Sequence, residues 1–168
     1  MYLLIILLII ILLVLAIMYN SIIKLKRKVE QSKSGIDVYC QQRFDLIPNL
    51  VKTVKEYANY ESKVLENITS LREQYFNTKD LTIGEELNNK VNKVLIAIDE
   101  NYPDLKASEQ FLNLQKNLVK TENQLQAARR IYNMDVTAYN TKISIVPFNI
   151  IAMIFKFKPA KLFEIDEK

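Results

Sequence analysis

The sequence ASEQFLNLQKNLVKTENQLQAARRIYNMDVTAYNTKI, residues 107–143, decides the fold, because it holds no proline and no glycine. Its apolar residues recur at steps of three, four and seven, which places them on one face of an α-helix. They are Phe111, Leu114, Leu118, Leu125, Ala128, Tyr132 and Tyr139. At about 1.5 Å per residue this helix is about 55 Å long. A two-faced helix of that length needs partner helices to cover its apolar stripe.

The residues before this stretch separate it from an earlier helix. Pro103 cannot continue a helix, and Asp104 is a suitable N-cap for the next one. Three amphipathic segments precede Pro103: one that continues from the N-terminal apolar run, one over about residues 48–75, and one whose periodicity is secure from about Glu85. Thr78 or Asp80 is a suitable N-cap for the third. We therefore predict an all-α fold, in which an N-terminal transmembrane helix continues into an antiparallel up-and-down four-helix bundle with long helices.

Pro48 decides how such a bundle is arranged. Its ring removes an N–H and disfavours the helical conformation of Ile47, so the chain either turns or kinks there. If the chain reverses, the turns at residues 43–49 and 100–104 meet at the end far from the membrane, and residues after 143 return to the membrane. If Pro48 only kinks a continuous helix, the later helices run in the opposite directions. The tail then does not return to the membrane, and membrane docking of the tail is not expected.

Residues 2–17 form an unbroken apolar run that reaches Ile23 if two polar residues lie in the interface. This is about the length that a bilayer core requires. No lysine or arginine precedes the run and no small-residue cleavage pattern follows it, which favours an uncleaved anchor over a signal peptide. The predicted division is an anchor at 1–23, a helical bundle at 24–143 and an apolar, basic tail at 144–168.

The net charge of +4 is concentrated beside this anchor. Residues 24–33 hold five basic side chains against Glu30, whereas residues 34–142 hold 14 basic and 15 acidic ones. A nucleic-acid partner is therefore not expected, because its basic surface would lie on the folded domain. The positive-inside rule predicts a single-pass protein of the cell membrane, with the N-terminus outside and the bulk of the chain cytoplasmic.

The tail combines isoleucine and phenylalanine with lysine. It is suited to the headgroup region of a membrane, or equally to covering the open end of the bundle as a hydrophobic lid. The residues predicted to contact membrane lipid are Lys24, Lys26, Arg27, Lys28, Phe148, Phe155 and Phe157.

The composition argues against an enzyme. Without any histidine, Ser/His and Cys/His catalysis and Glu-x-x-His di-iron sites are excluded. The single Cys40 is best explained as a packed thiol, and only Gly35 and Gly84 are available for a phosphate loop. We predict no catalytic residue, no cofactor and no metal site.

Two groups of polar residues are candidates for function. The first would gather at the distal turns and bind a partner protein, or would simply cap helix ends; it comprises Arg43, Asp45, Asn49, Glu100, Asn101, Tyr102 and Asp104. The second is a buried polar layer of Glu122 and Arg129. These two lie seven residues apart, too far for a direct pair, so their partners would come from other helices.

Several motifs resemble the bacterial LemA family. They are DV at 37–38, QRFDLIPNLV at 42–51, ENYPDLKA at 100–107, TEN at 121–123 and AARRIYN at 127–133. The resemblance covers nearly the whole chain and implies a single N-terminal membrane span with a helical bundle. It implies no defined biochemical activity.

These observations favour a non-catalytic, membrane-anchored scaffold or adaptor of the LemA type. The alternative is a membrane-surface protein that binds or organises lipid through the basic residues at 24–33 and the tail. The expected partners are membrane lipid and another protein, and a homo-oligomer is compatible with the sequence.

Overall fold

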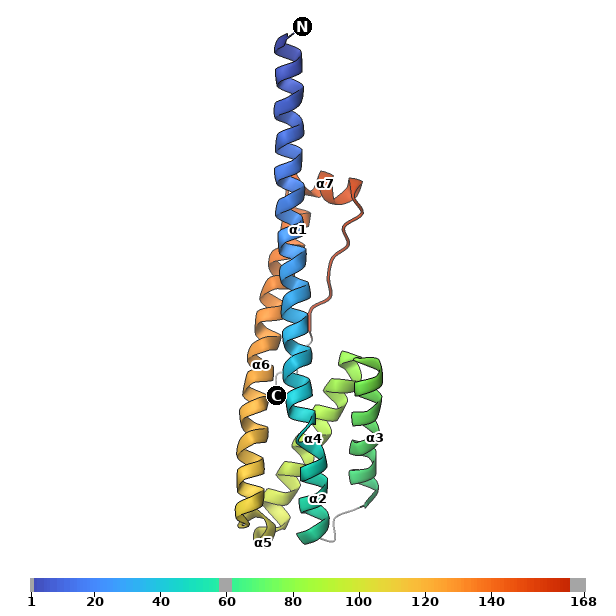
Figure 1. Cartoon of the computed structure of the whole chain (residues 1–168), viewed down its shortest axis with the longest axis vertical. Helices are drawn as coiled ribbons and strands as arrows, with labels where there is room; N and C mark the ends of the chain where they lie inside the picture. Colours follow the sequence, from blue (N-terminus) through green and yellow to red (C-terminus); the bar gives the residue numbers. More distant parts are fainter. Residues whose placement is uncertain (1, 58–61, 164–168) are drawn as a thin grey trace. The chain divides into compact units, whose positions relative to one another are not determined.

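The computed structural model describes residues 2–57 and 62–163. Its helices (Figure 1) are α1 (Tyr2–Phe44), α2 (Ile47–Tyr57), α3 (Ser62–Thr78), α4 (Leu81–Asn101), α5 (Pro103–Lys106), α6 (Glu109–Ser144) and α7 (Phe148–Ile154). The described residues contain no strand. The prediction of an all-α protein with an apolar N-terminal helix is therefore confirmed.

The chain divides into two compact units. One comprises Met1–Gly35 with Ala127–Lys168, and the other comprises Ile36–Gln126. The long helices α1 and α6 contribute to both units. The four-helix bundle predicted over residues 24–143 stays a prediction, since that range is shared between the units.

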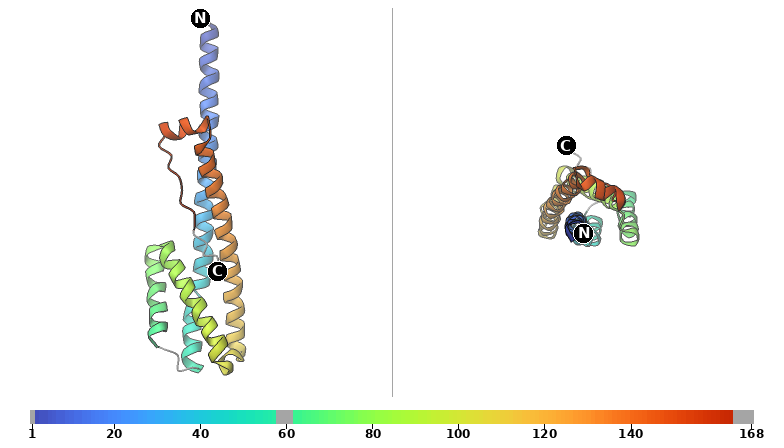
Figure 2. Two further views of the ribbon diagram at one scale, coloured as in Figure 1. Left: turned by 180° about the vertical axis from the view of Figure 1, so that it is seen from behind. Right: turned by 90° about the horizontal axis from the view of Figure 1, so that it is seen from above.

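In the first unit, the start of α1 is exposed and its continuation is packed. Every described residue up to Ile17 is exposed, and burial begins at Met18, which is 8% exposed. The core of this unit comes from α1, α6 and α7 and consists of Met18, Ile22, Val29, Val136, Tyr139, Ile143, Ile151 and Ala152. The axis of α7 runs across that of α1 (Figure 2). The ring of Tyr19 lies 4.7 Å from that of Phe155 and 5.9 Å from that of Phe157.

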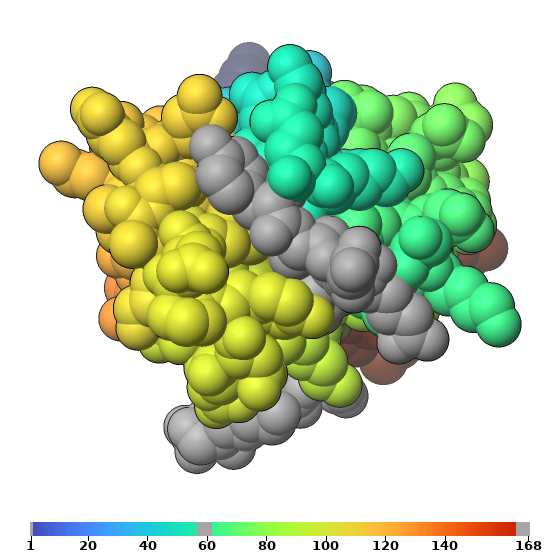
Figure 3. Space-filling model, turned by 90° about the horizontal axis from the view of Figure 1, so that it is seen from below, coloured from blue at the N-terminus to red at the C-terminus, as the bar shows by residue number. Residues whose placement is uncertain are grey.

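In the second unit, α2, α3 and α4 alternate in direction (Figure 1), and α5 packs against α2 and α4. Figure 3 shows residues of α2 and α3 and of the region around α5 on the surface of the end seen from below. Leucine, isoleucine and valine at helical spacing fill the interior, as the apolar periodicity predicts. The largest apolar side chains buried in this unit are Phe44, Tyr75 and Phe111.

The predicted reversal of the chain at residues 44–48 is wrong. Within the second unit, α2 continues in the direction of the end of α1, residues 36–44, and α3 is the first segment to run back (Figure 1). Helical hydrogen bonds bridge the interruption, from Asp45 N to Gln41 O at 2.9 Å and from Leu50 N to Leu46 O at 3.0 Å. Pro48 occupies the first turn of α2, where a missing N–H is tolerated, so it kinks the path without reversing it.

The predicted second helix at about 48–75 consists of two helices, α2 and α3, of which α3 runs back. Because of this additional reversal, the expectation that a kink at Pro48 keeps the tail away from the anchor is wrong, and α7 shares a core with Met18 and Ile22 of α1. The residues that connect α2 and α3, 58–61, lie outside the described part of the chain.

Two predicted helix starts also need correction. α4 begins at Leu81 and not near Glu85. Of the two candidate caps, Asp80 is the N-cap, since its carboxylate accepts a hydrogen bond from Thr82 N at 2.8 Å. α6 begins at Glu109, and Ser108 rather than Asp104 caps it, with Ser108 Oγ accepting from Phe111 N at 3.2 Å.

Gly84 lies inside α4 because its neighbour leaves no space for a side chain. A Cβ atom at this position would stand 2.9 Å from Cε2 of the buried Tyr75 ring. The glycine therefore serves close packing between α3 and α4 and does not mark the end of helical structure.

Candidate functional site

Arg43 is the central polar residue of the second unit and is only 1% exposed. Its Nη1 donates to the main-chain oxygen of Leu118, its Nη2 donates to Asn92 Oδ1 at 2.6 Å, and its Nε lies 3.3 Å from Glu122 Oε2. One guanidinium thus ties α1 to α4 and α6. Its five fixed donors suit such a three-way contact, which a lysine cannot reproduce.

The other residues predicted at the distal turns have different neighbours. Asp45 pairs with Arg72 of α3 at 3.4 Å, and Asn101 donates to Ala97 O within α4 at 3.0 Å. Asp104 lies in the first turn of α5. Asn92, which binds Arg43, precedes Asn101 by nine residues, which is about 13 Å along a helix. Through Asn92, therefore, Arg43 contacts the middle of α4.

The exposure of these residues separates those that are accessible to a partner protein from Arg43, which is part of the core. Asp45, Asn49, Glu100, Asn101 and Asp104 are exposed and Tyr102 is half-buried. A buried arginine cannot offer its side chain to a partner without disrupting the core. The proposed docking surface at the turns is therefore restricted to the residues other than Arg43.

The two residues of the predicted polar layer lie in different units. Glu122 finds its partner on another helix, Arg43 of α1, and also accepts from Gln126 Nε2 at 2.7 Å. Arg129 is 6% exposed, and its guanidinium carbon lies 4.7 Å above the centre of the Phe163 ring. Both contacts stabilise a buried or partly buried charge, one by an ion pair and one by a cation–π interaction.

Tyr75 is fully buried and packs edge-on against Phe44, with 4.9 Å between ring centres. Burial raises the pKa of the Tyr75 phenol far above its ordinary value, and the neighbouring Cys40 and Asp37 raise the pKa further. A phenol in this environment stays protonated at neutral pH and cannot act as a base. Tyr75 is therefore a core residue, and Cys40, which is 2% exposed, packs beside it.

Nothing in the described part of the chain resembles a metal centre, since no three acidic or cysteine side chains lie close enough together to hold an ion.

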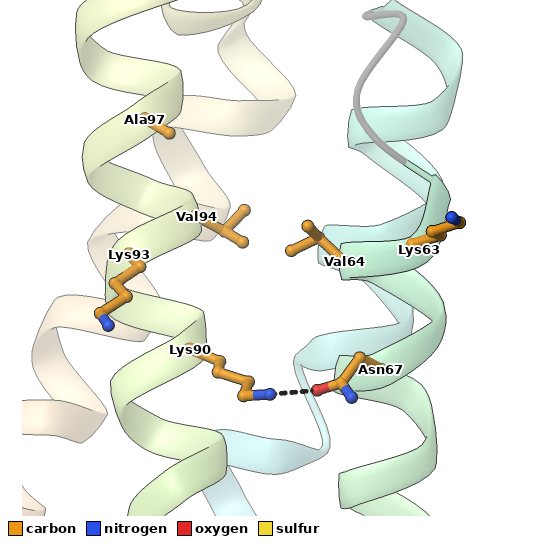
Figure 4. A pocket seen from close by; sticks show the side chains of 7 residues that line it. All are labelled: Lys63, Val64, Asn67, Lys90, Lys93, Val94 and Ala97. Atoms are coloured by element: carbon orange, nitrogen blue, oxygen red, sulfur yellow. Dashed lines mark hydrogen bonds between the residues drawn. The ribbon is translucent and has the colours of Figure 1, made fainter.

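A groove lies between α3 and α4 (Figure 4), with a volume of about 510 Å³. Val64 of α3 and Val94 of α4 point toward each other across it, and Ala97 extends the apolar surface. Lysines at positions 63, 90 and 93 surround this surface. Lys90 Nζ donates a hydrogen bond to Asn67 Oδ1 and lies 3.2 Å from Glu86 Oε1. Lys63 and Lys93 are exposed. The groove fits an apolar side chain that is flanked by acidic groups.

The residues predicted to contact lipid divide between surface and core. Lys24, Lys26, Arg27 and Lys28 are exposed on α1. Phe155 is 54% exposed, Phe148 is half-buried under Lys142 with 3.6 Å from Nζ to the ring centre, and Phe157 packs against the core of the first unit. The tail therefore supplies core packing through Phe157.

α7 also leaves a set of apolar side chains exposed. Met153 is 80% exposed and Ile154 64% exposed, and Ile150 and Phe155 lie beside them with more than half of their surface exposed. Phe155 of this set connects it to α1 through its contact with the Tyr19 ring.

Comparison with known proteins identifies the relatives of this chain. The model of the LemA family matches residues 32–168. The chain belongs to the LemA family. The match begins within α1 and includes the whole second unit together with α6, α7 and the C-terminal segment.

Among individual LemA-like relatives, Protein LemA of Metamycoplasma hominis is 26% identical over 88% of this chain and 69% of its own length. Magnetosome protein MamQ 2 of Paramagnetospirillum magneticum is 23% identical over 87% of this chain and 64% of its own length. Magnetosome protein MamQ of Magnetospirillum gryphiswaldense is 22% identical over 86% and 64% of the two chains. This chain thus spans about two thirds of the relatives that it matches.

Proposed function

We propose that this LemA-family chain is a non-enzymatic scaffold held at the cell membrane by the first part of α1. The observation that carries the proposal is the change in exposure at residues 17 and 18. From Tyr2 to Ile17 the large apolar side chains are at least 40% exposed, and from Met18 the same helix is packed. A contiguous apolar surface of this size is unfavourable in water and requires lipid or partner helices to cover it.

The lengths of the elements support a membrane edge at α7. Residues 2–17 rise about 24 Å, less than the roughly 30 Å of a bilayer core. Residues 18–23 add about 9 Å before the first lysine of α1. They include Met18 and Ile22, which share a core with Ile151 and Ala152 of α7. In the proposed arrangement, α7 would therefore contact α1 at the level where the bilayer core ends.

The orientation of α7 fits this position. A short helix that runs across α1 lies roughly in the membrane plane when α1 spans the bilayer (Figure 2). Its exposed Ile150, Met153, Ile154 and Phe155 would then enter the acyl boundary, and Lys156 and Lys158 would reach the headgroups. The cluster from Lys24 to Lys33 would lie just beyond, on the cytoplasmic side by the positive-inside rule.

The scaffold role rests on the absence of a catalytic constellation among the described residues and on two exposed surfaces of the second unit. One is the groove between α3 and α4, whose Lys63 and Lys93 complement an acidic partner segment with apolar side chains. The other consists of the exposed residues at the distal turns, such as Asn49 and Glu100. The MamQ relatives are named as magnetosome proteins, and the membrane location proposed here rests on the apolar start of α1 in this chain.

The experiment combines membrane extraction with site-specific crosslinking in cells that produce the full chain. We expect the chain to remain with membranes after alkaline carbonate washing. A photo-crosslinking residue at Lys93 or Glu100 should give discrete adducts, and the matched exposed position Lys116 on α6 should give none. Release by carbonate would contradict the anchor, and equal adducts at all three positions would contradict a defined docking surface.

The second candidate is a lipid-organising protein, which the exposed apolar set on α7 favours. Replacing Ile150, Met153, Ile154 and Phe155 with serine separates the two functions. If lipid organisation is the function, this variant loses the effect of the protein on vesicle shape or lipid order while α1 keeps it anchored. If scaffolding is the function, its crosslinks at Lys93 persist.

A further inference from the structure

The sequence Tyr-Asn occurs twice on α6, at residues 132–133 and 139–140, seven residues apart. A separation of seven places both pairs on the same face of a helix. The segment after α7, which is not helical from Phe157 to Phe163, lies against this face within the first unit. Each Tyr-Asn pair holds the segment in the same way.

The asparagines bind main-chain amides in pairs. Asn140 Nδ2 donates to Ala160 O at 2.8 Å, and Asn140 Oδ1 accepts from Ala160 N at 2.9 Å. Asn133 Nδ2 donates to Phe163 O at 2.9 Å, and Asn133 Oδ1 accepts from Phe163 N at 2.7 Å. Each asparagine side chain thus binds both the main-chain N–H and the main-chain oxygen of one residue of the segment.

The tyrosines add one contact to each pair. Tyr139 donates from its hydroxyl to Lys158 O at 3.0 Å, and Tyr132 donates to Lys161 O at 3.0 Å. In both cases the tyrosine binds the residue two positions before the one held by the adjacent asparagine. The contacts therefore repeat every seven residues of α6 and every three residues of the segment.

The two repeats match because the segment is extended. Seven helical residues rise about 10.5 Å, and three extended residues span about 10 Å. The segment runs antiparallel to α6, since Ala160 meets Asn140 and Phe163 meets Asn133. Pro159 suits such a segment, because it resists helix formation and the N–H that it lacks is not used by the repeat.

The side chains of the segment contribute little to these contacts. Lys158, Lys161 and Leu162 are exposed, and their side chains play no part in the repeat. Two positions are selective. Ala160 packs against the core of the unit, where a small residue is required, and the Phe163 ring lies under Arg129.

We propose that the two Tyr-Asn pairs form a binding site for the main chain of an extended peptide, and that residues 158–163 are its ligand in cis. The partner that the site fits in trans is the same segment of a second copy. Exchange between copies preserves every contact, so it carries little energetic cost beyond that of association. The site selects a small residue and, three positions later, an aromatic one, and tolerates the residues between them.

The test uses the full chain and the synthetic peptide KFKPAKLF, which has the sequence of residues 156–163. In the isotopically labelled chain, the amides of Ala160 and Phe163 should be protected from hydrogen exchange. Saturating unlabelled peptide should lower the protection factors of these two amides at least tenfold, while the core amides of α6 remain protected. Absence of protection, or protection that the peptide does not change, would overturn the proposal.

A set of variants provides an independent measurement. Ala160→Pro removes the N–H that Asn140 binds, which should free the site and increase binding of fluorescent peptide at least tenfold over the unaltered chain. Adding Asn133→Asp and Asn140→Asp should abolish that binding, because each carboxylate lacks the donor and faces a main-chain oxygen. Asn123→Asp, at an exposed position of α6, is the matched control and should leave peptide binding unchanged. Peptide binding that survives both asparagine substitutions would contradict the site.

Discussion

Arg72 donates from Nε to the main-chain oxygen of Phe44 at 2.8 Å. That oxygen is the acceptor which the residue four positions later would satisfy in a continuous helix, and this residue is Pro48, which has no N–H. The arginine of α3 thus replaces the hydrogen bond that the proline removes. The kink between α1 and α2 is held by a residue from another helix.

Replacement of Arg72 should therefore destabilise the protein in a way that depends on Pro48. Arg72→Ala leaves the buried Phe44 oxygen without its charged donor, which should lower the free energy of unfolding by about 1–3 kcal/mol. In the Pro48→Ala background the new N–H can bind that oxygen, so the cost of Arg72→Ala should fall. A double-mutant cycle by denaturant unfolding measures this coupling, with the exposed Arg130→Ala as control. Equal costs in the two backgrounds would disprove the substitution of one donor for the other.

The two glycines should respond to alanine in opposite directions. At Gly35 a Cβ meets nothing within 4 Å, so Gly35→Ala should stabilise the helix by about 0.5–1 kcal/mol. At Gly84 the Cβ would lie 2.9 Å from the Tyr75 ring, so Gly84→Ala should destabilise by about 1–3 kcal/mol through overpacking. Thermal unfolding of both variants checks the signs, and a stabilising Gly84→Ala would show that α3 and α4 do not pack this closely.

Replacing Arg43 with alanine should lower the free energy of unfolding far more than replacing an exposed arginine on the same helix. Arg43→Ala strands Glu122 and Asn92 in a largely buried layer, which should cost about 3–5 kcal/mol. The exposed pair of Arg27 and Glu30 provides the comparison, because Arg27→Ala should cost less than about 1 kcal/mol. Chemical unfolding of both variants measures the difference, and similar costs would contradict the contacts assigned to Arg43.

Stability should fall in alkaline solution because of the buried tyrosines. Burial raises the pKa values of Tyr75, Tyr132 and Tyr139 in the folded chain above the ordinary value of 10.0. Below that value the phenols are protonated in both states and titration does not affect stability. As the pH rises above it the unfolded chain ionises first, so the free energy of unfolding decreases.

The variant Tyr75→Phe isolates the contribution of one phenol. Its free energy of unfolding should decline less between pH 9 and pH 11 than that of the unaltered chain, measured by urea unfolding at each pH. Tyr2, for which most of the surface is exposed, gives the control Tyr2→Phe, which should not alter the decline. If stability declines equally with pH in all three proteins, the pKa of the Tyr75 phenol is not raised by burial.

Much of the fold can be predicted from the sequence, because apolar residues at helical spacing identify a helix from a short stretch of sequence. The apolar residues of 107–143 predict α6 to within a few residues, and the helical spacing of apolar residues elsewhere predicts an all-α fold. Pro48 is where this approach fails. A local rule states that a proline removes a hydrogen bond, but the donor that replaces it here is Arg72, which lies 24 residues away and on another helix.

The candidate sites depend even more on contacts that span the sequence. The sequence singles out Glu122 as a polar residue near an apolar stripe and Arg43 as a residue of a turn. Their contact with each other, and that of Arg43 with Asn92, depends on the relative register of three helices. The Tyr-Asn repeat is visible as a spacing of seven. Its ligand has no periodicity of its own, so the sequence alone does not connect residues 133 and 140 with residues 160 and 163.

The central claim is that α1 crosses the bilayer and that α7 lies at its edge. The most direct measurement is the depth of single labels in vesicles containing the full chain, with the buried Cys40 replaced by alanine so that each introduced cysteine is the only one. Labels at Leu8 and Met153 should be quenched by lipids carrying quenchers in the acyl chains, whereas a label at the exposed Thr137 of α6 should be quenched only by a soluble agent. Soluble quenching of Leu8 and Met153 to the same extent as Thr137 would contradict the account.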